Sequence, residues 1–247
     1  MTKYKLIILI IASHTMSIYD YCIDVWKKYM NTNKDIKSFL IYCNPTQDED
    51  IIIKDDEIFV KAIESYVPGI FLKTMKSIEY INKTYEYDFL LRTNMSTFFI
   101  FPKLLNYLDN ISQINFIGGH SYIYIGYNPY ITFIQGDGIL ISSDIGKQMV
   151  TIELDNNMIN TIPDDVYLGY ILGKCFPSFV HIPRSIHYEL LTDQKEVKEI
   201  NIGDPDKSNV GIFTDDIFRI RVKNVNRELD KPCFNLLLKK YYDIDMV

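Results

Sequence analysis

Apolar runs alternate with amphipathic segments along the first half of the chain, a pattern typical of β-α-β units. The run Tyr4–Ala12 is apolar without alternation, which predicts a central strand covered on both faces. Residues Ser17–Met30 repeat apolar positions at helical spacing with Trp26 on the apolar stripe, and Ile36–Cys43 predicts a second buried strand. The chain therefore begins with a β-α-β unit.

The same alternation continues after an acidic loop at Gln47–Glu57. Pro68-Gly69 predicts the start of a helix over Ile70–Lys83, and Tyr87–Leu91 predicts a third buried strand. Further predicted elements are a helix at Pro102–Asp109, Tyr- and Ile-rich strands within Asn115–Ile134, a strand after Gly138, helices from about Ser143 and over Val166–Gly173, and a final helix at Pro232–Tyr242.

The length and composition predict one globular α/β domain with a mostly parallel sheet in its first half and a mixed second half. The 247 residues are 47% hydrophobic and 23% charged, which excludes a disordered chain. Because no Gly/Ser- or Pro-rich linker interrupts the pattern, we expect a single domain over 1–247, with a nucleotide-binding half at about 1–110 and an acceptor and catalytic half at about 111–247.

The net charge of the chain and the spacing of its cysteines exclude several classes of function. A net charge of -6 argues against a protein that grips nucleic acid non-specifically, since that needs a basic surface. The four cysteines lie far apart, which indicates neither a metal knuckle nor a disulfide framework. We expect free thiols and a cytoplasmic location, in a host cell or a virion if the protein is viral. The sequence leaves the oligomeric state open.

The N-terminal apolar run allows a second interpretation. Lys3 and Lys5 precede the seven residues Leu6–Ala12, as charged residues precede the apolar region of a secretory signal. Seven apolar residues are too few to span a bilayer, and no small-residue cleavage motif follows. A buried first strand is the favoured interpretation, without a membrane span.

Three segments are candidates for chemistry. Ligands of open α/β sheets bind beyond the carboxyl ends of the strands, where Arg92–Phe98 follows Leu91; a simple strand-ending turn is the alternative. Asp164 and Asp165 open a helix, either as caps or with one of them as a general base. The glycines of Gly136–Gly138 allow close backbone approach to a ligand, or form a bulge.

In this order and spacing, the segments resemble the nucleotide-sugar-dependent glycosyltransferases of the β-1,3-glycosyltransferase and Fringe group, and related transferases of giant DNA viruses. In that group a helix with Lys-Thr precedes a strand ending Lys-Thr-Asp-Asp-Asp, then a Gly-rich segment ending in Ser, then Glu/Asp-Asp-Val followed by Gly. The matching segments are Phe71–Thr74, Tyr87–Ser96, Gly136–Ser142 and Asp164–Tyr170.

The resemblance implies a GT-A fold and inverting transfer of a sugar from a nucleotide diphosphate, with UDP as the expected nucleotide, to a hydroxyl of a glycan or glycoprotein. Asp165 would act as general base, and Asp164 would cap the helix or order the acceptor. The donor-binding residues that it implies are Lys73, Arg92, Thr93, Asn94, Ser96, Gly136, Asp137 and Gly138.

One departure from the family concerns the metal. The positions of the acidic triplet hold Asn94, Met95 and Ser96, which carry no charge, whereas Mn²⁺ or Mg²⁺ prefers carboxylates. No histidine matches the family's late ligand; His181 and His187 are unmatched candidates. We therefore expect transfer without a firmly bound metal, with the diphosphate stabilised by basic residues: Arg219, Arg221, Lys223 and Arg227. A solvated strand face is the alternative for these.

Two other functions remain as alternatives. A protein of the same fold that only binds a nucleotide or glycan is consistent with the missing acidic triplet. A nucleotidyltransferase is disfavoured, because Ser13–Ser17 follows the first strand without the glycine-rich phosphate loop that such an enzyme needs.

Overall fold

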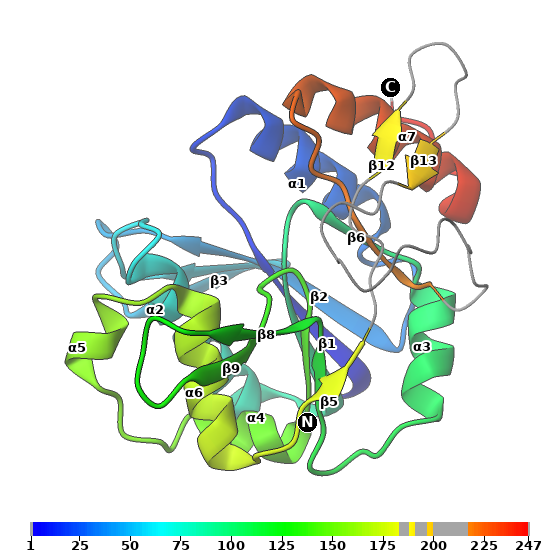
Figure 1. The fold of residues 1–247 in the computed structure, drawn as a ribbon. Helices are drawn as coiled ribbons and strands as arrows, with labels where there is room; N and C mark the ends of the chain where they lie inside the picture. The colour runs from blue at the N-terminus through cyan, green and yellow to red at the C-terminus, as the bar shows by residue number, and fades with distance from the viewer. Residues whose placement is uncertain (1, 183–187, 191–196, 200–216, 247) are drawn as a thin grey trace. The chain divides into compact units, whose positions relative to one another are not determined.

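The computed structural model describes residues 2–182, 188–190, 197–199 and 217–246. Its contacts group the chain into two compact units, whose elements are drawn in Figure 1. Unit 1 comprises residues 1–13, 33–94 and 112–182, and unit 2 comprises residues 14–32, 95–111 and 183–247. The units interleave along the chain, so neither corresponds to the halves 1–110 and 111–247 that the sequence suggested.

Unit 1 is built on an eight-stranded sheet in the order β11-β7-β10-β5-β1-β2-β4-β3. Strands β1, β2, β4 and β5 run parallel, as do β7 and β11, whereas β10 and β3 are antiparallel to their neighbours. The predicted α/β class with a mostly parallel sheet is confirmed. The strands are β1 (Lys3–Ile11), β2 (Ile36–Cys43), β3 (Ile51–Lys54), β4 (Glu57–Val60), β5 (Glu86–Asn94), β7 (Ile117–Gly119), β10 (Ile139–Ser142) and β11 (Val180–His181).

The helices of unit 1 complete its core. Every residue from Leu6 to Ile10 in β1 is fully buried, as the unbroken apolar run predicted. One side of β1 shares a continuous core with Phe71 and Ile78 of α2 and Leu168 of α6. The remaining elements of unit 1 are α2 (Gly69–Thr84), the hairpin β8 (Ser121–Tyr124) and β9 (Ile131–Ile134), α4 (Ser143–Met149), α5 (Asn156–Ile159) and α6 (Asp164–Cys175).

Two predictions about the strands of unit 1 were wrong. The predicted acidic loop at Gln47–Glu57 contains strand β3 and the turn that leads into β4, and this turn places Asp55 at a φ of 52°. Strand β5 does not end at Leu91 but continues to Asn94, because β1 pairs with it along this whole length. The first residues of the predicted loop are therefore part of the sheet.

Unit 2 has an aromatic core. Tyr29 of α1 stacks on Trp26, Phe98 and Phe101, at ring-centroid distances of 4.9, 4.9 and 5.1 Å. Trp26 is fully buried, and its Nε1–H donates to the carbonyl of Met95 over 3.1 Å. Helices α1 and α7 contact each other. The described elements of unit 2 are α1 (Ser17–Tyr29), β6 (Thr97–Phe99), α3 (Phe101–Asp109), β12 (Tyr188–Leu190), β13 (Val197–Glu199), β14 (Arg219–Arg221), a 3-10 turn (Arg227–Leu229) and α7 (Asp230–Tyr242).

Candidate functional site

The sheet of unit 1 has a topological switch point at β1. The chain proceeds from β1 to β2 and β4 on one side, and then returns to β5 on the other side of β1. Ile11 and Asn94 are paired at the carboxyl ends of these two parallel strands. Ligands of open α/β sheets bind at such a crevice. The end of β5 is therefore where we look for a site.

A buried ion pair lies at the end of β5. The guanidinium of Arg92 contacts the carboxylate of Asp164, the first residue of α6, and the two side chains are 5% and 8% exposed. Arg92 Nη1 also donates to the carbonyl of Gly136 over 2.5 Å. Arg92 thereby joins three segments that the sequence analysis had selected independently.

Gly136 is needed because Arg92 approaches its backbone so closely. A Cβ at this position would collide with Nη1 of Arg92, and the side chain of Asp165 lies on the same side. The group that approaches the backbone of Gly136 is thus a protein side chain, and the close approach of a ligand to these glycines stays a prediction.

Asp165 is the carboxylate beside this ion pair. Its Oδ2 accepts a hydrogen bond from the N–H of Gly136 over 3.1 Å, and its Oδ1 accepts one from the N–H of Val166 over 3.0 Å. Burial, and next the charge of Asp164, raises the pKa of Asp165, whereas Arg92 and the two backbone donors act in the opposite direction. Each carboxylate oxygen retains a lone pair for a further hydrogen bond. Asp165 is half-buried, so it remains reachable from solvent.

The two aspartates have different environments, and neither of them is the N-cap residue of α6. The residue before the helix is Pro163, which has no capping side chain. Asp164 pairs with Arg92, so its charge is compensated. Among the described residues Asp165 makes no ion pair, and burial raises its pKa.

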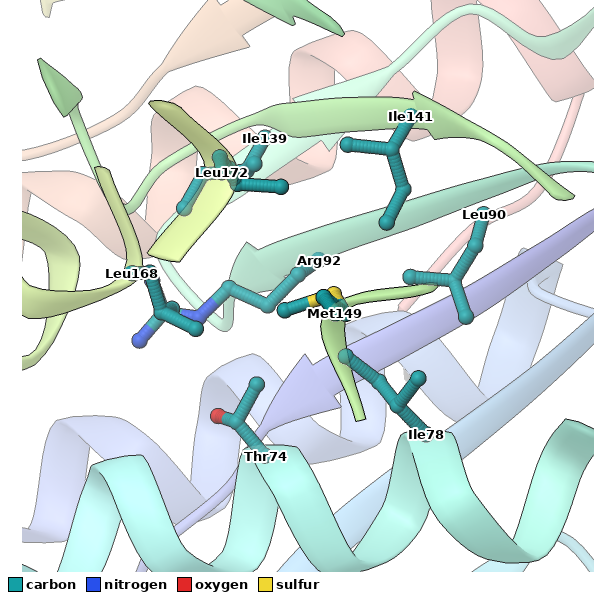
Figure 2. A pocket seen from close by; sticks show the side chains of 9 residues that line it. All are labelled: Thr74, Ile78, Leu90, Arg92, Ile139, Ile141, Met149, Leu168 and Leu172. Carbon is teal, nitrogen blue, oxygen red and sulfur yellow. The ribbon is translucent and has the colours of Figure 1, made fainter. Parts of the chain in front are cut away.

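A small cavity adjoins Arg92 on its apolar side. Its volume is about 10 Å³, and it lies between α2, β5, β10, α4 and α6, as Figure 2 shows. Except for Thr74 and Arg92, the residues that line it are apolar: Ile78, Leu90, Ile139, Ile141, Met149, Leu168 and Leu172. At this size it holds one water molecule at most. It is a packing gap and not a ligand site.

The other predicted donor-binding residues of unit 1 lie close by, but most are buried. Thr93 is fully buried, and its Oγ1 donates to the carbonyl of Asp137 over 2.9 Å. Asp137 is 2% exposed. Asn94 is half-buried, and its Nδ2 lies 3.5 Å from the carbonyl of Gly136. Of these side chains, Asn94 is the most accessible to a ligand.

Lys73 forms a separate buried ion pair in unit 1. Its Nζ contacts Glu64 Oε1 and Oε2 at 2.9 and 2.8 Å, and donates to the carbonyl of Ala12 over 2.8 Å. Its side chain is 0% exposed. Lys73 thus ties α2 to the carboxyl end of β1, and its charge is balanced by Glu64.

The remaining predicted residues belong to unit 2 or are unmatched. Ser96 and the basic group Arg219, Arg221, Lys223 and Arg227 all lie in unit 2. His181 lies in unit 1, where its Nδ1 is 3.2 Å from Ser121 Oγ and its ring is 4.9 Å from that of His120. His187 lies outside the described residues. In the part of the chain that the structure describes, no three His, Cys, Asp or Glu side chains gather as a metal site would require.

Two residues near these groups were not selected from the sequence. Tyr66 is 65% exposed, and its pKa is raised by burial and then by the charges of Asp165 and Asp164, so its hydroxyl lies within their electrostatic range. Glu64 balances Lys73. Both residues lie shortly before Pro68-Gly69, where the sequence predicts the start of a helix. The aromatic residue beside this helix start is the feature by which Tyr66 could have been selected from the sequence.

No protein-family model matches the chain, and no curated protein shows significant similarity to it. Within the described residues, no helix combines the length and apolar character needed to cross a membrane. No disulfide joins the four cysteines.

Proposed function

We propose that the protein is a glycosyltransferase that moves a sugar from a nucleotide diphosphate donor, with UDP as the expected nucleotide, to a hydroxyl of a glycan or glycoprotein. The motif resemblance suggests the reaction. The observation that carries the proposal is the environment of Asp165, a half-buried carboxylate with a raised pKa at the carboxyl end of β5. Such a group is suited to accept a proton from a hydroxyl near neutral pH.

In the proposed reaction the acceptor hydroxyl attacks the anomeric carbon as the bond to the diphosphate breaks, so that the configuration inverts. Asp165 takes the hydroxyl proton, and the nucleoside diphosphate departs with the bonding electrons. General base catalysis of this kind contributes about 10² to 10⁴ in rate.

Arg92 acts in this scheme as a positioning residue and not as a donor ligand. It holds the carbonyl of Gly136, whose N–H in turn holds Oδ2 of Asp165. Its ion pair with Asp164 compensates one carboxylate while leaving the other to react. Tyr66 offers an exposed aromatic ring in the electrostatic range of Asp165, and an acceptor sugar can stack on such a ring.

Replacing Asp165 by Asn tests the proposal. We expect nucleoside diphosphate release from a panel of nucleotide sugars and acceptors to fall about 100-fold or more, while donor affinity stays within a few-fold, because the base acts on the acceptor. Asp155→Asn is the matched control, since Asp155 caps α5 by accepting from Asn157 N over 2.8 Å and asparagine caps equally well.

Three outcomes would contradict the proposal or its assignment. Loss of turnover in Asp164→Asn with Asp165→Asn unaffected would exchange the roles of the two residues. Binding of nucleotide sugars without turnover of any of them would favour a binding protein of the same fold. A nucleotide sugar that binds only away from Thr93 and Asn94 would remove the donor site from the end of β5.

A further inference from the structure

Unit 2 gathers cationic side chains around two consecutive hydroxyl groups at the start of β6. Strand β14 pairs antiparallel with β6, which places Arg221 opposite Thr97. Arg221 Nη1 donates to Thr97 Oγ1 over 3.2 Å, and Arg227 Nη2 donates to Ser96 Oγ over 3.0 Å. Two guanidinium groups from different elements are thus brought to neighbouring residues of the chain.

A buried carboxylate fixes the second guanidinium. Asp230 is fully buried, and its Oδ1 accepts hydrogen bonds from N and Nδ2 of Asn224 over 2.8 and 2.9 Å. Arg227 Nη2 lies 3.0 Å from Asp230 Oδ2, and the Arg227 side chain is still 20% exposed. Asp230 therefore orients a guanidinium that solvent can still reach.

Among the residues that the structure describes, positive charge predominates in this cluster. Burial, and next the charge of Arg227, lowers the pKa of Arg221 to about 10. Burial, and next the charges of Arg221 and Arg227, lowers the pKa of the exposed Lys223. Asp230 acts in the opposite direction on both groups without reversing the shift. An anion bound here would relieve the mutual repulsion of the cations.

We propose that Arg221, Lys223 and Arg227, with the hydroxyl of Ser96, form a binding site in unit 2 for a phosphate-type dianion. Guanidinium groups bind phosphate oxygens through paired hydrogen bonds, and a lysine adds a mobile point charge. Arg219 is not part of this site. The residue is 3% exposed, and its charge acts on the hydroxyl of Tyr107, whose pKa burial raises and Arg219 lowers. The proposal goes beyond glycosyl transfer and does not depend on it.

The test measures binding of inorganic phosphate, pyrophosphate, UDP and uridine to the full chain by calorimetry at constant ionic strength, with thermal unfolding followed through Trp26. This residue is the protein's single tryptophan, lies in unit 2 and donates to the carbonyl of Met95, next to Ser96. We expect pyrophosphate and UDP to bind and to raise the unfolding temperature, and uridine to have no effect. Phosphate alone binding as tightly as UDP would identify free phosphate as the source of the dianion.

Charge-neutral variants locate the site. Lys223→Gln and Arg227→Gln should each weaken pyrophosphate binding about ten-fold or more, because each removes a charge-assisted contact. Lys231→Gln is the matched control: Lys231 lies on α7, is 39% exposed and pairs with Glu228 at 2.7 Å. Its affinity should stay within two-fold.

Several results would overturn the site. These are no binding of phosphate or pyrophosphate, equal weakening by Lys231→Gln, or uridine binding as tightly as UDP. If Arg227→Gln fails to fold because Asp230 loses its partner, Lys223→Gln decides the matter, since its side chain is exposed. Unchanged affinity in that variant would then refute the proposal.

Discussion

Replacing Arg92 by Met should destabilise the protein strongly, because it removes one partner of a buried ion pair. The side chains of Arg92 and Asp164 are 5% and 8% exposed, so the carboxylate that remains has little access to water. Breaking a buried pair in this way costs about 3 to 5 kcal/mol. The carbonyl of Gly136 loses its donor at the same time.

Protonation sets an upper limit on the electrostatic part of this cost. Neutralising an ordinary aspartate at pH 7 costs about 4 kcal/mol, since each pKa unit is worth about 1.4 kcal/mol. The electrostatic part of the cost cannot exceed this amount. The penalty in Arg92→Met should therefore shrink as the pH is lowered toward about 4.

A double-mutant cycle separates the ion pair from general disruption. Arg92→Met combined with Asp164→Leu replaces both charges with apolar groups and should recover most of the loss, giving a coupling energy of about 2 to 4 kcal/mol. The control is Lys37→Met, because Lys37 and Asp56 form an ion pair in the same unit with both side chains 24% exposed. It should cost no more than about 1 kcal/mol.

Equilibrium unfolding in urea, followed by far-UV circular dichroism at pH 7 and pH 5, provides these free energies. A loss below about 1 kcal/mol in Arg92→Met, or a double variant as unstable as the single one, would show that Asp164 is not held in a buried ion pair. The positioning role assigned to Arg92 would then fail as well.

Three further predictions concern the stability of unit 1 and the metal dependence of the proposed reaction. Asp165→Asn should be more stable than the wild type at pH 7 and equal to it below about pH 4. The raised pKa of Asp165 means that folding disfavours its charged form, so the wild type loses stability as pH rises through that pKa. Thermal unfolding measured across this pH range checks the prediction, and a variant less stable than the wild type at pH 7 would contradict it. Gly169→Ala should lower the free energy of unfolding in urea by about 1 to 3 kcal/mol, since a Cβ would meet the backbone of Phe133 and Thr132. Gly173→Ala is the control and should be neutral or stabilising, because a Cβ there meets nothing within 4 Å. Equal losses in the two variants would refute the close contact at Gly169. If transfer is measured, it should survive EDTA; full inactivation reversed by Mn²⁺ would show that a cation is required.

The helices and strands followed from the chain's local pattern more closely than their arrangement did. The unbroken apolar run of β1, the Pro68-Gly69 start of α2 and the aspartates opening α6 all predicted elements that the structure contains. Hydrophobic periodicity and backbone geometry act within a few residues, so the sequence alone carries this information. The end of β5 was misjudged, because its last residues owe their strand conformation to pairing with β1.

The candidate site likewise has features that the sequence predicts and features that only the tertiary structure shows. Asp165, Gly136 and Arg92 could be selected from residue type and motif, but the sequence could not show that Arg92 contacts Asp164, which lies 72 residues away. Polar side chains at a strand end looked like ligands for a substrate. Tertiary packing instead pairs Arg92 with Asp164 and Lys73 with Glu64, because a buried charge requires a compensating partner. Which carboxylate pairs with a cation was therefore decided by long-range contacts, and the local sequence determined only that two carboxylates open the helix.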